Sequence, residues 1–275
     1  MRLVTLRTAG GTRAGRLDGD RVIELEDADV GALLRGGAER LEAARTASGP
    51  SRALSEVDLA AVIPNPPKVV CVGQNYLAHI LEQGAKVPDY PTLFNKFNNA
   101  LIGPNDDITL PKVSDQCDYE VELAMVIGKA GRHISEADAL DHVAGYTILN
   151  DISIRDYQNR TTQWMQGKSF EGTTPVGPCL VTADEIDPLN LRLWTEVDGR
   201  LLQDSNTSDL VHKPSQLIAY ISQIFTLQPG DLIPTGTPSG VGMARTPQVW
   251  LRDGSMVRSG IDGIGVLANR CVKEA

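Results

Sequence analysis

The segment 118–130, DYEVELAMVIGKA, places three acidic residues at alternate positions and then continues as an apolar run. Residues two apart in a β-strand point to the same face, so Asp118, Glu120 and Glu122 form one row. Neighbouring carboxylates repel one another, and burying them is costly unless they are paired or bind a cation. The fold must therefore either open this face to water or place positive charge against it.

A further acid follows a second apolar segment. Residues 146–149 are Tyr-Thr-Ile-Leu, and Asp151 comes directly after the next residue, Asn150. Together with Glu120 and Glu122, Asp151 would supply three hard oxygen ligands, a set that suits Mg²⁺ or Mn²⁺. The alternative is an edge strand with a solvated acidic face.

The segment 75–84, NYLAHILEQG, predicts a short helix that ends at Gly84. His79 and Glu82 are three residues apart, so they are neighbours on one helix face. A histidine oriented by a carboxylate can remove a proton from water. The alternative is an amphipathic surface helix with an incidental ion pair.

Two other segments contain candidate ligand-binding residues. Lys168 follows a glycine in the turn-rich segment 164–178, and a buried lysine there would stabilise an enolate or a carboxylate. The segment 234–242, PTGTPSGVG, lacks the Gly-Lys-Ser/Thr of a Walker motif, but its backbone could approach a ligand closely. Thr237 within it could donate to a carboxylate. A surface lysine and a structural turn are the alternatives.

Proline residues at 64–67, PNPP, predict a domain boundary in this chain of 275 residues. We therefore expect a small N-terminal α/β domain at 1–64 and a main domain at 65–275. The main domain contains mostly short strands and turns, so a Rossmann or TIM architecture is not expected. The sequence predicts helices at 29–48, 76–83, 135–142 and 213–225.

Charge and composition exclude some functions. The net charge is −9, which argues against binding to nucleic acid. No apolar run approaches the roughly 20 residues needed to cross a bilayer, and the N-terminus does not resemble a signal peptide. The four cysteines lie far apart without a CxxC motif, so we expect reduced thiols and a cytoplasmic protein.

Together these segments resemble the fumarylacetoacetate hydrolase (FAH) family, in particular its branch of acylpyruvases and 2-hydroxyhepta-2,4-diene-1,7-dioate isomerases. The similar segments occur in the family's order and cover roughly residues 68 to 272. They are 75–84, 93–111, 118–135, 145–158, 167–182, 216–242 and 260–271.

The resemblance implies an α+β, mostly β fold: a mixed β-sandwich roll that forms a homodimer and binds Mg²⁺ or Mn²⁺. It also implies a role for each candidate residue. These are metal ligation by Glu120, Glu122 and Asp151, water activation by His79 and Glu82, an active-site lysine at Lys168, and substrate-carboxylate binding by Arg155, Gln158 and Thr237.

The resemblance implies a small 2-oxo acid substrate and an enolate mechanism. We expect hydrolysis of a C–C bond in an acylpyruvate, because both His79 and Glu82 are present. The same site would also support decarboxylation of an oxaloacetate-type acid or a keto–enol or double-bond isomerisation. A non-catalytic relative that binds a dicarboxylate is a further alternative. Leu77 and Gln74 depart from the family pattern, as do the residues on either side of Lys96, and these departures leave the identity of the substrate open.

Overall fold

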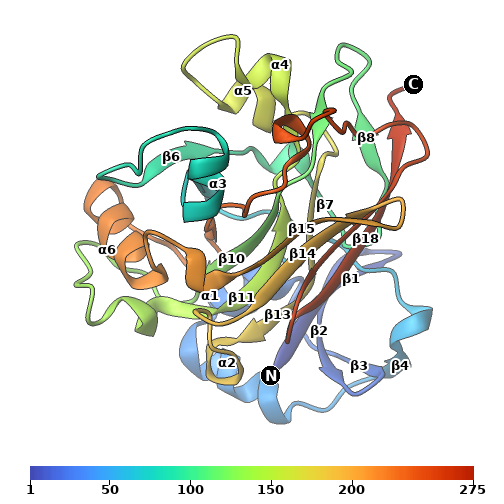
Figure 1. Cartoon of the computed structure of the whole chain (residues 1–275). Coiled ribbons are helices and arrows are strands. Elements are labelled where there is room, and N and C mark those ends of the chain that lie inside the picture. The colour runs from blue at the N-terminus through green and yellow to red at the C-terminus, as the bar shows by residue number, and fades with distance from the viewer.

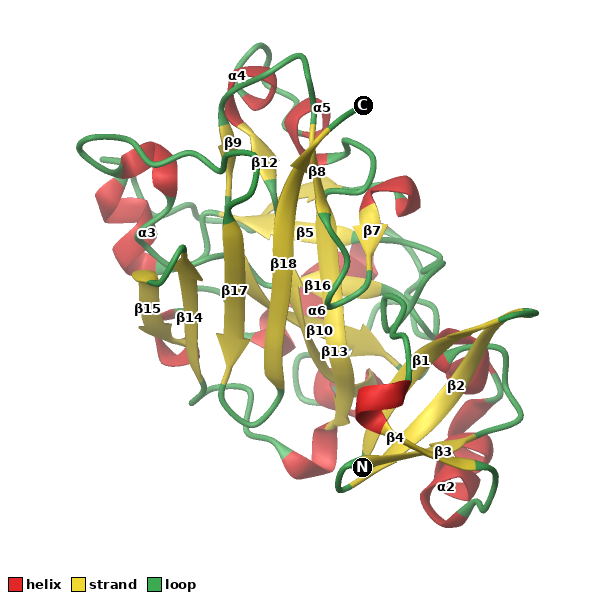
Figure 2. Cartoon of the chain, turned by 90° about the vertical axis from the view of Figure 1, so that its right-hand side faces the viewer, coloured by secondary structure: helices red, strands yellow, loops and turns green.

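The computed structural model describes residues 1–275 and contains two large β-sheets with short helices around them (Figures 1 and 2). The larger sheet has nine strands, with β7 (Leu101–Ile102) paired to β13 beside the main path. The main path runs β16 (Leu232–Pro234), β10 (Val121–Ile127), β11 (Val143–Asn150), β13 (Thr174–Thr182), β1 (Arg2–Thr8), β2 (Gly11–Asp18), β3 (Arg21–Glu24) and β4 (Ser51–Ala53).

The second sheet has five strands and packs against β10, β11 and β13 of the first. Its order is β15 (Arg200–Asn206), β14 (Arg192–Val197), β17 (Met256–Ile261), β18 (Gly265–Lys273) and β8 (Ile108–Leu110). Two short ribbons complete the strands: β5 (Val70–Gly73) with β6 (Thr92–Asn95), and β9 (Cys117–Asp118) with β12 (Ser153–Ile154). The pairs β7–β13 and β8–β18 are parallel and the others antiparallel, so the predicted mixed, mostly β sandwich roll is confirmed.

The helices are short, and none is both long and apolar enough to span a bilayer. They are α1 (Val30–Arg35), α2 (Gly37–Thr46), α3 (Leu77–Glu82), α4 (Arg155–Gln158), α5 (Met165–Lys168) and α6 (Pro214–Ile224). Six 3₁₀ turns accompany them: η1 (Leu54–Glu56), η2 (Asn98–Ala100), η3 (Ala139–His142), η4 (Ala183–Glu185), η5 (Thr207–Asp209) and η6 (Gly242–Ala244).

Two helix predictions need correction. The helix expected at 29–48 is divided into α1 and α2, because Gly37 has a φ of +82°, which a continuous helix does not allow. The helix expected at 135–142 is wrong: only the short turn η3 forms there before the chain enters β11. The helices expected at 76–83 and 213–225 are present as α3 and α6.

The alternation of side chains along β10 divides them between two faces, and Glu122 lies on the face away from the core between the two sheets. Leu123, Met125 and Ile127 belong to the core between the two sheets. Ala124 and Val126 point to the opposite face and pack in a second core that includes α1. Glu122 has the same parity as Ala124, so its side chain leaves the strand on the face away from the core between the sheets. The strand can therefore be fully buried and still carry a functional acid.

The N-terminal strands extend the larger sheet instead of forming a separate one. β1 pairs with β13, with Leu3 opposite Leu180, and its other edge pairs with β2. Leu3 and Leu180 also share one apolar core. The hydrogen bonding of the larger sheet continues across the predicted domain boundary near residue 64. The boundary therefore stays a prediction about which parts of the chain fold as units.

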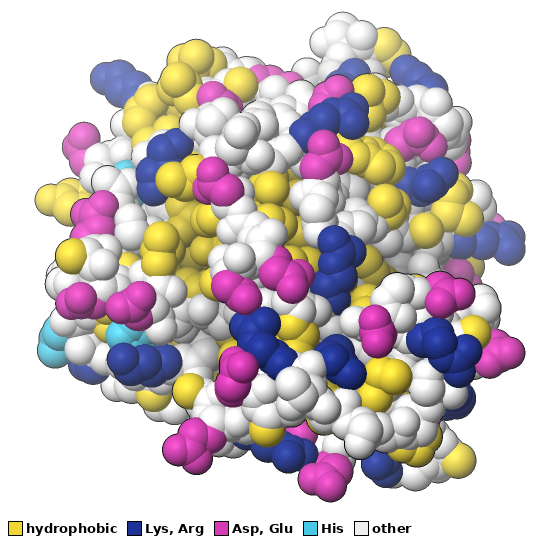
Figure 3. Space-filling view, turned by 90° about the horizontal axis from the view of Figure 1, so that it is seen from below, with side chains coloured by type: hydrophobic (Ala, Val, Ile, Leu, Met, Phe, Trp, Pro, Cys, Tyr) yellow, Lys and Arg dark blue, Asp and Glu magenta, His cyan; other side chains and the backbone are white.

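The face of the molecule that lies at the bottom of Figure 1 and faces the viewer in Figure 3 carries charges of both signs. Lys and Arg side chains alternate there with Asp and Glu side chains, and no continuous basic patch forms on this face (Figure 3). This face therefore lacks the basic surface that binding to a phosphate backbone requires.

Candidate active site

The predicted site residues surround one cavity at the end of the larger sheet, with a volume of about 110 Å³. Its walls come from β5, α3, β6, α4, α5 and the loop that follows β16. The residues that line it and were also predicted from sequence are His79, Glu120, Glu122, Arg155, Gln158, Lys168 and Thr237. Sequence segments more than 150 residues apart thus contribute to one pocket.

Three acids cluster at this cavity. The ligand oxygens of Glu120, Glu122 and Asp151 all lie within 4.8 Å of one another, and all three residues are buried. The pairing of β10 with β11 brings them together, because Val121 lies opposite Asn150 at the adjoining strand ends. The predicted trio is therefore one cluster in space.

Two buried ammonium groups contact the cluster. Lys168 Nζ lies 2.5 Å from Glu120 Oε2 and 2.7 Å from Asp151 Oδ2. Lys96 Nζ lies 2.6 Å from Asp151 Oδ1. Burial alone would lower the pKa of Lys168, but the charges of Asp151 and Glu120 outweigh it and raise that pKa. The lysine is therefore a charged member of the cluster.

Glu122 has no cationic partner in the structure. Its Oε2 accepts one hydrogen bond, from the backbone N–H of Gly236 at 2.8 Å. Burial, followed by repulsion from Asp151 and Glu120, raises the pKa of Glu122 well above its usual range. Positive charge is therefore lacking on the Glu122 side of the cluster.

The acidic cluster fits a divalent cation. All its donors are carboxylate oxygens, the ligands that Mg²⁺ and Mn²⁺ prefer. A dication held by Glu120, Glu122 and Asp151 would supply the positive charge that Glu122 lacks, and it would offset the burial and the repulsion that raise the pKa of Glu122.

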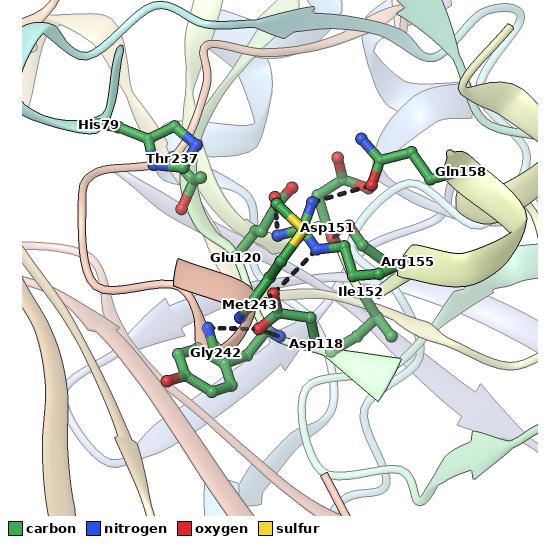
Figure 4. A network of polar contacts seen from close by, with 12 residues as sticks. His79, Asp118, Glu120, Asp151, Ile152, Arg155, Gln158, Thr237, Gly242 and Met243 are labelled. Carbon is green, nitrogen blue, oxygen red and sulfur yellow. Dashed lines mark hydrogen bonds and ion pairs between the residues drawn. The ribbon is translucent and has the colours of Figure 1, made fainter. Parts of the chain in front are cut away.

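Arg155 holds one side of the cluster in place (Figure 4). Its Nε donates to Asp118 Oδ2 at 2.8 Å, and one terminal nitrogen donates to Glu120 Oε1 at 2.6 Å. The other terminal nitrogen donates to Gln158 Oε1 at 2.8 Å. Burial would raise the pKa of Glu120, but the charges of Arg155 and Lys168 dominate and lower it.

The contact with Arg155 determines which end of the Gln158 amide is free. Because Gln158 Oε1 accepts from Arg155, its Nε2 is directed away from that contact (Figure 4). An N–H donor is therefore available to a ligand carboxylate. All three nitrogens of Arg155 already contact protein acceptors. Of the two predicted carboxylate-binding residues Arg155 and Gln158, Gln158 is therefore the better placed to offer an N–H group to a ligand.

His79 and Glu82 lie on one face of α3, as their spacing predicts. Glu82 Oε2 accepts from His79 Nδ1 at 3.0 Å, and Oε1 accepts from the backbone N–H of Gly240 at 2.9 Å. Burial would raise the pKa of Glu82, but the bonds from His79 and Gly240 outweigh it and lower that pKa. A carboxylate only accepts, so Nδ1 carries a proton; an amide nitrogen only donates, so Nε2 offers its lone pair to Gln83. Gln83 Nε2 donates to that lone pair at 2.9 Å.

Thr237 lines the cavity, but its hydroxyl is used within the protein. Its Oγ1 donates to the carbonyl of Val121 at 3.0 Å and accepts from Gln203 Nε2 at 2.9 Å. The contribution of the glycine-rich loop to the acidic cluster is the N–H of Gly236, whose φ of +102° favours glycine.

Two charged residues of the site, Lys96 and Asp118, had no predicted role there. In the sequence, only the residues on either side of Lys96 stood out. Lys96 itself contacts Asp151, which lies 55 residues further along the chain. Asp118 stood in the acidic row, and it accepts from Arg155 as well as from the backbone N–H groups of Gly242 and Met243, at 2.7 and 3.0 Å. The signal in the sequence was the acidic row that leads into the apolar run 123–127, because acids carried into a buried strand need positive charge.

Comparison with known proteins places this fold and site in a family. The family model described as "Fumarylacetoacetate (FAA) hydrolase C-terminal" matches residues 68–272. The chain belongs to this family, and it is an enzyme.

The similar proteins include several activities. "Oxaloacetate tautomerase fahd2, mitochondrial" from Xenopus laevis is 44% identical over 267 residues, which cover 93% of this chain and 84% of that protein. A putative HpcE protein from Mycobacterium smegmatis has a TM-score of 0.92 and 38% identity, and both chains are covered completely. Maleylpyruvate hydrolase from Sphingobium sp. SYK-6, solved with manganese(II) and pyruvate, has a TM-score of 0.83 and 32% identity, again with complete coverage of both chains.

Proposed function

We propose that this enzyme acts on small 2-oxo acids through an enolate, and that its main reaction is keto–enol tautomerisation of an oxaloacetate-like 2-oxo dicarboxylate. The observation that carries the proposal is the presence of two complementary groups in one small cavity. The His79–Glu82 pair offers a proton acceptor, and the cluster of Glu120, Glu122 and Asp151 with Lys168 offers a site for developing negative charge.

The residues divide the chemistry between them. A divalent cation, when held by Glu120, Glu122 and Asp151, would act as a Lewis acid toward the 2-oxo group. Lys168 Nζ adds positive charge beside the oxygen that becomes negative, and Gln158 Nε2 donates to the substrate carboxylate.

Proton transfer is the task of the α3 pair. A substrate that displaces the Gln83 amide gives its C3 proton to His79 Nε2, and the C3–H electrons form the C2–C3 double bond. The carboxylate of Glu82 stabilises the imidazolium that results, and the imidazolium then protonates the 2-oxygen to complete the enol. This reaction needs no water as a reactant. The activity named for the Xenopus relative supports this choice.

Hydrolysis of an acylpyruvate is the second candidate. The observation that favours it is the close His79–Glu82 contact, an arrangement that also activates water, and one structural neighbour is a maleylpyruvate hydrolase. Decarboxylation of a 2-oxo dicarboxylate would use the same enolate and replace proton loss with loss of CO₂.

Rates on two substrates test the proposal. With Mg²⁺ or Mn²⁺, the enzyme should tautomerise oxaloacetate well above the uncatalysed rate and release little pyruvate from acetylpyruvate. Enol absorbance and a coupled pyruvate assay measure the two reactions. Rapid cleavage of acetylpyruvate with no tautomerisation would establish the second candidate instead.

Variants of the α3 pair test the assigned proton transfer. His79→Ala and Glu82→Gln should each reduce tautomerisation by about 10²-fold, the usual contribution of a positioned acid–base group. The double variant should lose little more, because the two residues act as one unit. The exposed His133 provides a control: His133→Asn suits its φ of +52° and should leave the rate unchanged. Full activity in both single variants would exclude this pair as the base.

A further inference from the structure

Gln74 differs from the other carboxamide side chains that line the cavity. The side chain of Gln83 contacts His79, and that of Gln158 contacts Arg155. Asn159 is exposed to solvent. Gln74 is half-buried and lines the cavity, and its amide has no hydrogen-bond partner in the protein. Both a donor and an acceptor are therefore available there.

The backbone of Gln74 is held in a conformation that side chains rarely adopt. Its φ is +52°, and residues in this region persist only where the surrounding structure determines them. The adjacent Asn75 is fully buried and anchors the segment: its Nδ2 donates to the carbonyls of His212 and Thr235 at 3.0 and 2.8 Å, and its Oδ1 accepts from the N–H of His212 at 2.7 Å.

The residue on the other side of Gln74 is equally constrained. A Cβ added to Gly73 would lie 2.2 Å from Cζ3 of Trp164, so the indole packs directly on the glycine backbone. Trp164 in turn contacts Phe94 edge to face, with ring centroids 5.6 Å apart. Anchors on both sides therefore fix the position from which the Gln74 side chain reaches the cavity.

The charges around the cavity explain why a neutral amide at this position matters. The two cationic side chains that line it, Arg155 and Lys168, are already paired with the acids of the site. Neither is free for a second substrate carboxylate. Gln74 bonds to none of the clustered acids, so its amide is free to bind a ligand in the cavity.

We propose that Gln74 is a specificity-determining residue that hydrogen-bonds the distal group of the substrate, the group at the end opposite the 2-oxo carboxylate. It selects 2-oxo acids whose distal group accepts a hydrogen bond, a carboxylate above all, over acids that end in a methyl group. A site built to hydrogen-bond a substrate group discriminates against analogues that lack the group. This inference rests on the proposed function, since it assumes that a 2-oxo acid binds here.

Binding of unreactive ligands tests the inference without relying on turnover. Oxalylglycine ends in a carboxylate, N-ethyloxamate has a methyl group in its place, and oxalate has no distal group. Calorimetry on the Mg²⁺-loaded enzyme should show tighter binding of oxalylglycine than of N-ethyloxamate. Gln74→Gly, which accepts the positive φ, should weaken oxalylglycine binding by about tenfold, the effect of losing one hydrogen bond to a charged group. It should change oxalate binding by less than about twofold, because oxalate has no distal group for Gln74 to bind.

Two further variants test whether the ligand preference comes from the Gln74 amide or from the backbone conformation at residue 74. Gln74→Asn keeps an amide on a residue that tolerates this φ, and it should retain part of the preference for oxalylglycine. Asn159→Ala removes the exposed amide and should leave the preference intact. If Gln74→Gly weakened the binding of all three ligands equally, the inference would be overturned. A wild-type enzyme that bound oxalylglycine no more tightly than N-ethyloxamate would overturn it too. A preserved preference in an enzyme that does not tautomerise oxaloacetate would support the role of Gln74 and refute only the proposed reaction.

Discussion

Chelation of divalent cations should lower turnover by about 10³-fold or more, because the several kcal/mol of charge stabilisation that a metal supplies would be lost. Addition of Mg²⁺ or Mn²⁺ should restore the rate. The expectation rests on the buried cluster of Glu120, Glu122 and Asp151. Turnover in excess EDTA, followed by titration with each ion, is the measurement. An enzyme that keeps its full rate in EDTA would not be metal-dependent.

Glu122→Gln separates metal binding from folding. The variant should lose metal binding and activity, yet it should melt at a higher temperature than the metal-free wild type. A neutral Gln side chain avoids the cost of burying a carboxylate and its repulsion from Asp151 and Glu120, the causes that raise the pKa of Glu122. Mg²⁺ should raise the melting temperature of the wild type and leave that of the variant unchanged. Glu171→Gln, at an exposed position, is the control and should behave as the wild type.

Arg155→Met should destabilise the metal-free protein by about 3–5 kcal/mol, because it leaves Asp118 and Glu120 buried beside an uncharged side chain. For a chain of this size the loss corresponds to a fall of about 10 °C in melting temperature. Urea and thermal unfolding in EDTA measure the change without a contribution from bound metal.

Two comparisons identify the cause of that loss. Arg192→Met removes an equally close pair with Asp204 at the surface, where ion pairs contribute little, and should have a far smaller effect. Adding Asp118→Asn to Arg155→Met should recover part of the lost stability, because one uncompensated charge disappears. If Arg155→Met were as mild as the surface control, Arg155 would not be needed to compensate the acids.

Two local properties of the sequence, strand periodicity and helix spacing, predicted parts of the site correctly. The alternation in 118–127 predicted that Glu120 and Glu122 share a face, and the i,i+3 spacing predicted the contact between His79 and Glu82. These are short-range properties of strands and helices. The sequence alone also indicated that buried acids would require positive charge.

Other features depend on contacts that no local pattern encodes. β13 was not predicted as a strand, because Pro175, Gly177 and Pro178 are typical of turns, yet β11 and β1 pair with its two edges. Lys96 was not predicted to be buried, because its partner Asp151 comes from a distant strand end. Tertiary pairing outweighed local propensity in both cases.

The pairing of β1 with β13 has a consequence for biosynthesis. Leu3 can meet Leu180 only after the ribosome has released the second strand, which at about 5–20 residues per second takes roughly 10–35 s. The nascent β1–β2 hairpin has one open edge throughout that interval, and open strand edges recruit other chains. Protection of that edge would therefore favour correct folding, and we expect the yield of this enzyme in the cell to respond to chaperone supply.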